Sequence, residues 1–452
     1  MNKTNYIFLF LFLLVSNAFS QDKKVDLKDV QDVKYKRSSM AMLLFDPMLS
    51  AQAAEKNREF VMNEYNLTIS ESPVSTEEFA EILRFTFDSI GVPKKYNSHL
   101  LDDVTFYDKN KYMVTDEDRI AVDGKGLSKF SKKLLTDSVT GSTGSAKDKR
   151  IQYGKYFDEQ DLPRKIVAKW VNRNPETGDM DAELIQKRAF FSASAQEIEQ
   201  ARNNQIGVTT LTGNMFDLFS NTFAVINTFS LLDVEVVVAL MMGEAMRKAD
   251  PISKKLILMA QKKLGEGYII QCNTTLYKLN WNDSIKNDLF YVWGHEDTKN
   301  MWNTDSIFHP KLEYLGSANS TASVSMAFKK SIPEKELIKI AVVRSMDKAI
   351  VRLQKKFDVF KTKTPIISVD PIAAKIGMKE GVKSGDKFEV LERKYDEKTG
   401  RDTFKKIAII KAGKEIWDNQ YGAEDLESTD GMTIFEGKSK GLYPGLLIRQ
   451  IK

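Results

Sequence analysis

Residues 376–390 read Ile-Gly-Met-Lys-Glu-Gly-Val-Lys-Ser-Gly-Asp-Lys-Phe-Glu-Val, and this stretch determines the predicted fold at the end of the chain. Its Gly-Asp step predicts a tight turn, because Gly permits the backbone conformation and Asp caps the amides of the turn. Residues 393–403 contain Asp-Glu-Lys-Thr-Gly, where Gly400 is placed for the positive φ of a hairpin turn. Short strands at this spacing predict a small β-barrel or sandwich over residues 363–452. The strands expected there are residues 366–369, 374–376, 387–392, 404–410 and 446–451.

The longest predicted helix precedes this barrel, at residues 333–357. Ser331 and Glu334 predict a capping box at its start. Its core-facing positions recur every four residues, which is typical of a helix packed on one side. They are Leu337, Ala341, Ser345, Ala349, Leu353 and Phe357. The basic residues that face elsewhere are Arg344, Lys348, Arg352 and Lys355. We interpret this back of the helix as a solvated surface, with contact to anionic lipid as the alternative.

Upstream of the helix, residues 150–362 predict a mixed α/β domain. Residues 223–232, 268–281 and 322–328 read as strands, the second by clear alternation. One face of that alternating strand carries Ile270, Cys272, Thr274 and Leu276. Ser194 and Glu197 predict a second capping box, for a helix that ends near residue 207.

A dense apolar stretch at residues 234–242 requires a separate decision between core and membrane. A spanning helix here would hold Asp233 and Glu235 near its middle, and each charge is costly in hydrocarbon. We therefore predict a core segment and no transmembrane span in the mature chain.

Residues 21–136 predict a small α/β domain. It would contain a buried strand at 40–45, a helix at 51–64 and a further helix that begins at the capping box of Ser75 and Glu78. The apolar positions of the latter are Phe79, Ile82, Leu83, Phe87 and Ile90. Residues 137–149 are rich in Ser, Thr and Gly and predict a flexible linker or loop, since the phosphate-binding pattern GxxxxGK[ST] is absent. The predicted fold class is thus α+β and multidomain.

The first twenty residues predict a secretory signal peptide, residues 1–20. Lys3 precedes the apolar run 7–15, and Ala18 and Ser20 are small residues placed for cleavage before Gln21. The run is too short to span about 30 Å of hydrocarbon as a helix. We therefore expect an exported protein that is periplasmic or associated with the outer membrane.

Composition excludes several function classes. The 67 basic and 62 acidic residues give a net charge of +5, which does not favour a nucleic-acid binder. The single cysteine, Cys272, excludes an internal disulfide framework, and its place in an alternating strand favours buried packing over nucleophilic chemistry. The three histidines, His99, His295 and His309, are scattered. Residues 295–297 (His-Glu-Asp) are a candidate metal or ligand cluster, although an exposed loop is the better interpretation.

No residue is assigned a catalytic, cofactor-binding or metal-binding role. Abundant carboxylates leave a glycosidase-like acid pair open, yet no spacing singles out one pair. Five aromatic residues could form a sugar-stacking surface, with ordinary packing as the better interpretation. They are Tyr291, Trp293, Trp302, Phe308 and Tyr314.

The pattern at residues 376–390 resembles the C-terminal SH3-like modules of envelope proteins, such as an accessory protein of the flagellar ring. The helix at 341–357 followed by Thr364-Pro365 is similar to an arrangement in secreted proteins of Gram-negative bacteria. The resemblance implies an SH3-like barrel, an envelope location and no catalytic residues to transfer.

We therefore predict a non-enzymatic, secreted binding or assembly component of the cell envelope. The alternative is a secreted hydrolase that acts on glycan or peptide through unassigned carboxylates. The expected partner is an envelope protein, with self-association and peripheral membrane contact as further candidates. Neither nucleic acid nor a cofactor is expected.

Overall fold

The computed structural model describes residues 38–65, 74–90, 96–98, 106–107, 146–181, 184, 218–234, 236, 250–255, 267–293, 308–325, 332–396, 401–423 and 431–451. Several sequence predictions lie outside these residues. They are the signal peptide, residues 137–145 of the linker, the helix from Ser194, most of residues 234–242 and the cluster at 295–297.

The described elements fall into a layered region and a barrel. The layered region contains β1 (Ser39–Phe45), α3 (Pro47–Tyr65), α4 (Thr76–Ile90), β2 (Asn97–Ser98), β3 (Phe106–Tyr107), α7 (Ala146–Glu159), α8 (Leu162–Val171), β4 (Thr222–Asp233), β5 (Gly267–Leu279), α14 (Asp283–Asp288), the π-helical turn η2 (Leu289–Trp293), β6 (Leu312–Ser325), α15 (Glu334–Lys356) and η3 (Asp358–Phe360). The barrel contains β7 (Thr364–Val369), β8 (Ile372–Ala374), η4 (Met378–Glu380), β9 (Lys387–Asp396), β10 (Arg401–Ala412), β11 (Thr433–Glu436) and β12 (Leu447–Gln450). The protein is therefore α+β.

Six strands of the layered region form one mixed sheet. Their order is β2-β1-β4-β5-β6, and β3 also pairs with β1. β1 is parallel to β4, whereas β5 is antiparallel to both β4 and β6. The predicted strands at 40–45, 223–232 and 268–281 are confirmed as β1, β4 and β5. Because β1 precedes residues 137–149 and β4 follows them, both segments contribute strands to the same sheet.

The sixth strand is longer than its sequence predicted. β6 begins at Leu312 rather than near residue 322, although residues 316–320 read Gly-Ser-Ala-Asn-Ser, which are residues of low β propensity. Its pairing with β5 continues over the whole strand, from Leu312 to Ser325. Gly316 also leaves room for the ring of Phe357, which packs where a Cβ would stand. Tertiary packing therefore overrides local propensity here.

The end of the predicted linker is helical. α7 begins at Ala146, so residues 146–149 are not part of a loop. Ala, Lys and Arg favour helix at these positions. The helix is held by Tyr153, Tyr156 and Phe157, which are buried in the core on its face of the sheet.

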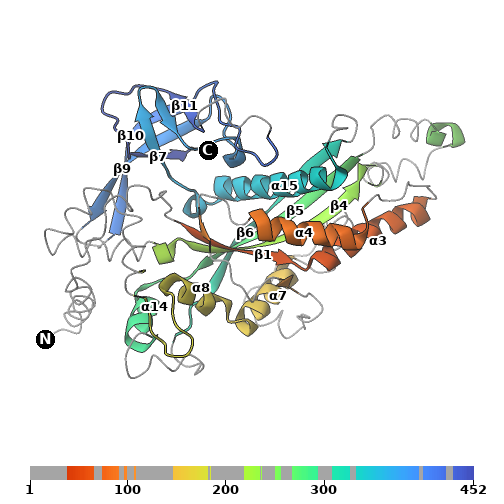
Figure 1. Ribbon diagram of the computed structural model, residues 1–452, viewed down its shortest axis with the longest axis horizontal. Helices are drawn as coiled ribbons and strands as arrows, with labels where there is room; N and C mark the ends of the chain where they lie inside the picture. The colour runs from red at the N-terminus through yellow and green to blue at the C-terminus, as the bar shows by residue number, and fades with distance from the viewer. Residues whose placement is uncertain are drawn as a thin grey trace.

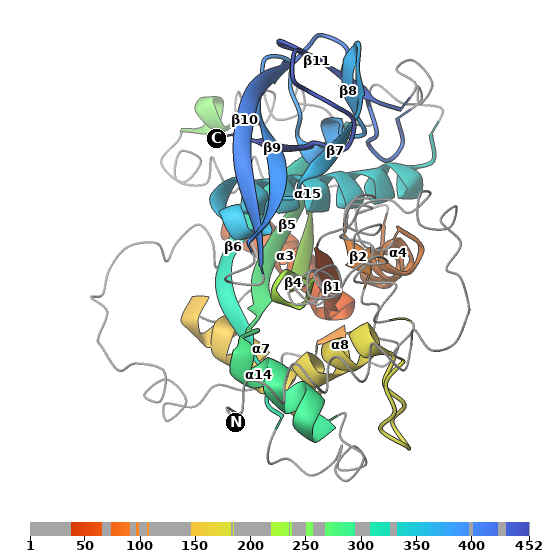
Figure 2. The same cartoon turned by 90° about the vertical axis from the view of Figure 1, so that its left-hand side faces the viewer.

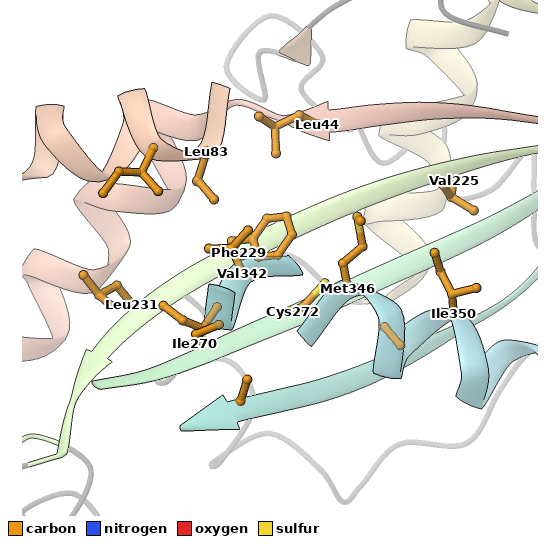
Figure 3. Packing of buried hydrophobic residues seen from close by; sticks show 14 of the residues in the cluster. Leu44, Leu83, Val225, Phe229, Leu231, Ile270, Cys272, Val342, Met346 and Ile350 are labelled. Carbon is orange, nitrogen blue, oxygen red and sulfur yellow. The ribbon is translucent and has the colours of Figure 1, made fainter. Parts of the chain in front are cut away.

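Helices cover both faces of the sheet (Figure 1). Helices α3, α4 and α15 lie on one face, and α7, α8 and α14 lie on the other. Figure 3 shows Val342, Met346 and Ile350 of α15 lying over Phe229, Ile270 and Cys272 of the sheet. Each large apolar side chain buried in this way contributes roughly 1.5 to 3 kcal/mol, so this stripe holds α15 on the sheet.

The predicted face of α15 is confirmed, but its predicted cap is wrong. Leu337, Ala341, Ser345, Ala349 and Leu353 are all buried. The N-cap is Pro333, whose carbonyl accepts from the amides of Glu336 and Leu337 and whose side chain makes no capping hydrogen bond, while Ser331 lies outside the described residues. A capping box with Ser331 as N-cap would start the helix at Ile332, whereas the helix starts two residues later, at Glu334. The capping box of α4 is confirmed, with both Ser75–Glu78 hydrogen bonds present.

The C-terminal strands form a closed barrel in the order β10-β11-β8-β7-β12-β9. This closed, six-stranded, antiparallel barrel is compatible with an SH3-like module. Its core contains Ile366, Phe388, Val390, Ile410 and Phe435. The prediction missed β11, and it placed the second strand at 374–376 where β8 is Ile372–Ala374. Figure 2 shows the barrel above α15, and the long hairpin of β9 and β10 extends from the barrel past α15.

Candidate functional site: the two sides of the barrel

One side of the barrel packs closely on α15 through two glycines. Gly381 has φ +73°, and a Cβ there would lie 2.6 Å from Cγ1 of Val351. Gly422 has φ +71°, and a Cβ there would lie 2.7 Å from Cδ1 of Ile340. Only glycine satisfies both the left-handed backbone and this close approach. We call these contacts, together with the polar contacts of the next paragraphs, the docked side.

Polar groups fix the same junction. Arg344 of α15 donates from Nε to the carbonyl of Tyr421 in the barrel at 3.2 Å. The hydroxyl of Tyr421 donates back to Oε1 of Glu336 at 3.3 Å. Arg344 therefore faces the barrel, and the back of α15 is in part an intramolecular contact surface. Farther along, Lys348 and Arg352 donate to the carbonyls of Thr321 and Asn319 in β6.

The turn η4 is held so that Lys379 faces α15. Oε2 of Glu380 accepts from the amide of Gly377 at 2.7 Å and from Nδ2 of Asn419 at 2.9 Å. The amide of Lys379 donates to Oδ1 of Asn419 at 2.8 Å, and the amide of Met378 donates to the carbonyl of Trp417 at 2.9 Å. These bonds fix the backbone of the turn.

Asp347 is the most unusual group of the docked side. Its side chain is 7% exposed, and Nζ of Lys379 lies 4.0 Å from Oδ1. The second oxygen, Oδ2, is buried with no hydrogen-bond partner. Burial raises the pKa of this carboxyl to about 7, Lys379 opposes the shift, and Glu380 adds to it. Asp347 therefore gains or loses its proton near neutral pH, and this changes the net charge of the docked side.

Unlike the docked side, the outer surface of β10 is exposed to solvent. Lys405, Lys406, Ile407, Ile409 and Lys411 are all exposed, and we call these five residues the β10 wall. Ile407 is 37% exposed and Ile409 is 48% exposed. None of the three lysines has an ion pair with another described residue. The acid beside Ile409 on β9, Glu389, is already paired with Arg449 at 2.6 Å.

The structure places several other candidate residues in packing roles. Cys272 is buried as predicted, and burial raises the pKa of its thiol to about 12, so it stays protonated. Trp293 and Phe308 contact one another with their rings tilted by 41° and their centroids 4.3 Å apart, in the core between the sheet and helices α7 and α8. These two aromatics are therefore not available as a sugar-stacking surface. His309 is exposed.

Sequence reasoning missed Asp347, Lys379 and Gly381. The available signal was Asp347 itself, because an acid directly after Met346 lies next to the apolar stripe of the helix. Nothing in the sequence indicated which part of the chain it faces. A strand at residues 404–410 was predicted, but its exposed isoleucines were not recognised.

The remaining described features are small or structural. Two hollows lined by described residues each measure about 30 Å³, against roughly 300 Å³ or more for a site that holds a small organic ligand. Within the residues that the structure describes, no group of three or more His, Cys, Asp or Glu is placed to hold a metal ion. In the same part of the chain, every helix is too short or too polar to cross a membrane.

Comparison with known proteins adds no relative. No model of a protein family matches the chain, and no curated protein matches it.

Proposed function

We propose that this protein is an exported, non-catalytic component of the cell envelope that binds another protein through the β10 wall. The observation that carries the proposal is the asymmetry of the barrel. Its docked side is engaged with α15, while the β10 wall presents two isoleucines and three unpaired lysines to solvent. Exposed apolar residues flanked by charge are typical of protein interaction surfaces.

Export rests on the sequence of the first twenty residues, with its apolar run and small residues before Gln21. The expected location is the periplasm or the outer membrane. The mature chain is then an assembly component that holds a partner by means of the barrel and uses the layered region as the support.

The test is a pull-down of the full mature chain from cross-linked envelope fractions. We compare the wild type with Ile407→Ser/Ile409→Ser, and we use Ile367→Ser as the matched control. Ile367 lies on β7 of the same barrel and is 44% exposed, so it resembles Ile409 in all but position. A stoichiometric partner lost only with the β10 variant supports the proposal. A partner retained by that variant rejects the β10 wall as the binding surface.

A further inference from the structure

β10 has one paired edge and one open edge. On one edge it pairs with β9 from Arg401 to Lys411. On the other edge it pairs with β11 only at Lys411 and Ala412. For residues 405–409, the structure describes no strand and no other backbone hydrogen bond on that second edge. A row of backbone N–H and C=O groups without a partner strand is a template for an added strand.

The side chains along this edge define what would fit it. Ile407 and Ile409 offer apolar contacts to alternate side chains of an added strand. Lys405, Lys406 and Lys411 form no ion pair with a described acid, although Lys405 and Lys411 lie opposite Glu392 and Glu436 in the strand ladders. Because Glu392 is already paired with Lys394, the three lysines leave a net positive charge beside the isoleucines. A basic strand is therefore repelled, and an acidic strand is attracted.

Two further features limit the choice of partner. The ladder between β9 and β10 is irregular between Lys406 and Ala408, where Ile407 is an extra residue. Lysines and β-bulges at an edge prevent indiscriminate pairing, including pairing with a second copy of the same strand. An acidic strand is attracted rather than repelled by these lysines. The same lysines therefore make the edge selective for acidic partners.

We infer that the open edge of β10 binds an extended, acidic segment of another protein by strand addition. The inference rests on the proposed function and names the chemistry of its partner. Backbone hydrogen bonds supply part of the affinity, and the lysines supply the choice of sequence.

The experiment uses the full mature chain and a fluorescent peptide of alternating Val and Glu. Fluorescence anisotropy measures its binding, beside a peptide of alternating Val and Lys and a Val-Glu peptide methylated on alternate backbone amides. The protein variant is Lys405→Glu/Lys406→Glu. Its matched control is Lys375→Glu/Lys383→Glu, which makes the same charge change at two exposed lysines elsewhere in the barrel.

We expect binding of the Val-Glu peptide to weaken about tenfold or more in the Lys405→Glu/Lys406→Glu variant, to fall with added salt, and to be unchanged in the control. The methylated peptide and the Val-Lys peptide should not bind the wild type. Equal binding of the methylated peptide overturns strand addition, and equal binding of the Val-Lys peptide overturns the acidic preference. If no peptide binds while Ile407→Ser/Ile409→Ser still loses the cross-linked partner, this inference fails and the proposed function stands.

Discussion

The docked side and the β10 wall are two surfaces of one small barrel, yet the first is packed against α15 and the second is exposed. On the docked side, Gly381 and Gly422 bring backbones together, and Asp347 is buried with one oxygen unpaired. On the β10 wall, the side chains of the isoleucines and lysines are exposed, and the lysines form no ion pair with a described residue. The first surface has the features of a finished contact, and the second has those of a contact that awaits a partner.

This difference gives the two sides separable effects. Changes on the docked side should alter the free energy of unfolding, because they disturb groups that are already packed. Changes on the β10 wall should leave that free energy nearly unchanged and alter binding. The following predictions test this separation, beginning with the largest expected effect.

The largest effect should come from the charge of Asp347. Its pKa in the folded protein is about 7, against an ordinary value of 3.8, so the folded state holds the proton more tightly than the unfolded chain. The contribution to stability is fully present below the ordinary value and is lost as the pH rises through about 7. The loss is on the order of 4 kcal/mol. Asp347→Asn should remove this part of the pH dependence, as measured by urea unfolding at a series of pH values.

Asp358→Asn is the matched control, because Asp358 follows the same helix but is exposed and paired with Lys361. It should keep the pH dependence of the wild type. Lys379→Met should move the Asp347 titration to higher pH, since Lys379 is the cation that opposes its raised pKa. An Asp347→Asn variant with the same pH profile as the wild type would contradict the assignment.

The next largest effect should come from Gly381→Ala. The substitution adds strain at φ +73° and a contact of 2.6 Å with Val351, which together should cost about 3 kcal/mol of unfolding free energy. Gly441→Ala separates the two causes, because Gly441 has φ +83° and nothing within 4 Å of a Cβ. It should cost about 1 kcal/mol. Equal losses in urea unfolding would show that the close approach to α15 has no energetic weight.

These two predictions depend on contacts that the sequence did not reveal. Periodicity predicted the apolar stripe of α15 and the strands β1, β4 and β5, because burial on one face leaves a regular spacing. It missed β11, which is four residues long, and the first half of β6, whose Gly316 is explained only by Phe357. Asp347 meets Lys379 across a separation that no local pattern encodes. The strand at residues 404–410 was predicted, but the open edge of β10 depends on where β11 ends.

A smaller effect on stability is expected from Ile407→Ser/Ile409→Ser. Both side chains are substantially exposed, so each change should alter the unfolding free energy by no more than about 0.5 kcal/mol. Recovery of a cross-linked partner should nevertheless fall, whereas Ile367→Ser should preserve it. A large loss of stability in the double variant would mean that the β10 wall is part of the folded core, which would end the separation proposed here.

The smallest effect should come from Tyr421→Phe. It removes the hydroxyl that donates to Glu336 at 3.3 Å on the docked side. The expected cost is about 0.5 kcal/mol, at the low end of the range for a hydrogen bond because this one is long. Tyr443→Phe, at a tyrosine that is 50% exposed on the same barrel, is the control and should have no measurable effect. Equal unfolding midpoints for both variants would mean that this hydrogen bond does not stabilise the junction.

The decisive experiment is hydrogen–deuterium exchange of the mature protein with and without the Val-Glu peptide. On binding, we expect slower exchange in residues 401–411 and unchanged exchange in η4 and at Tyr421. Slower exchange centred on η4 and α15, with none in β10, would contradict this expectation and make the docked side the binding surface instead.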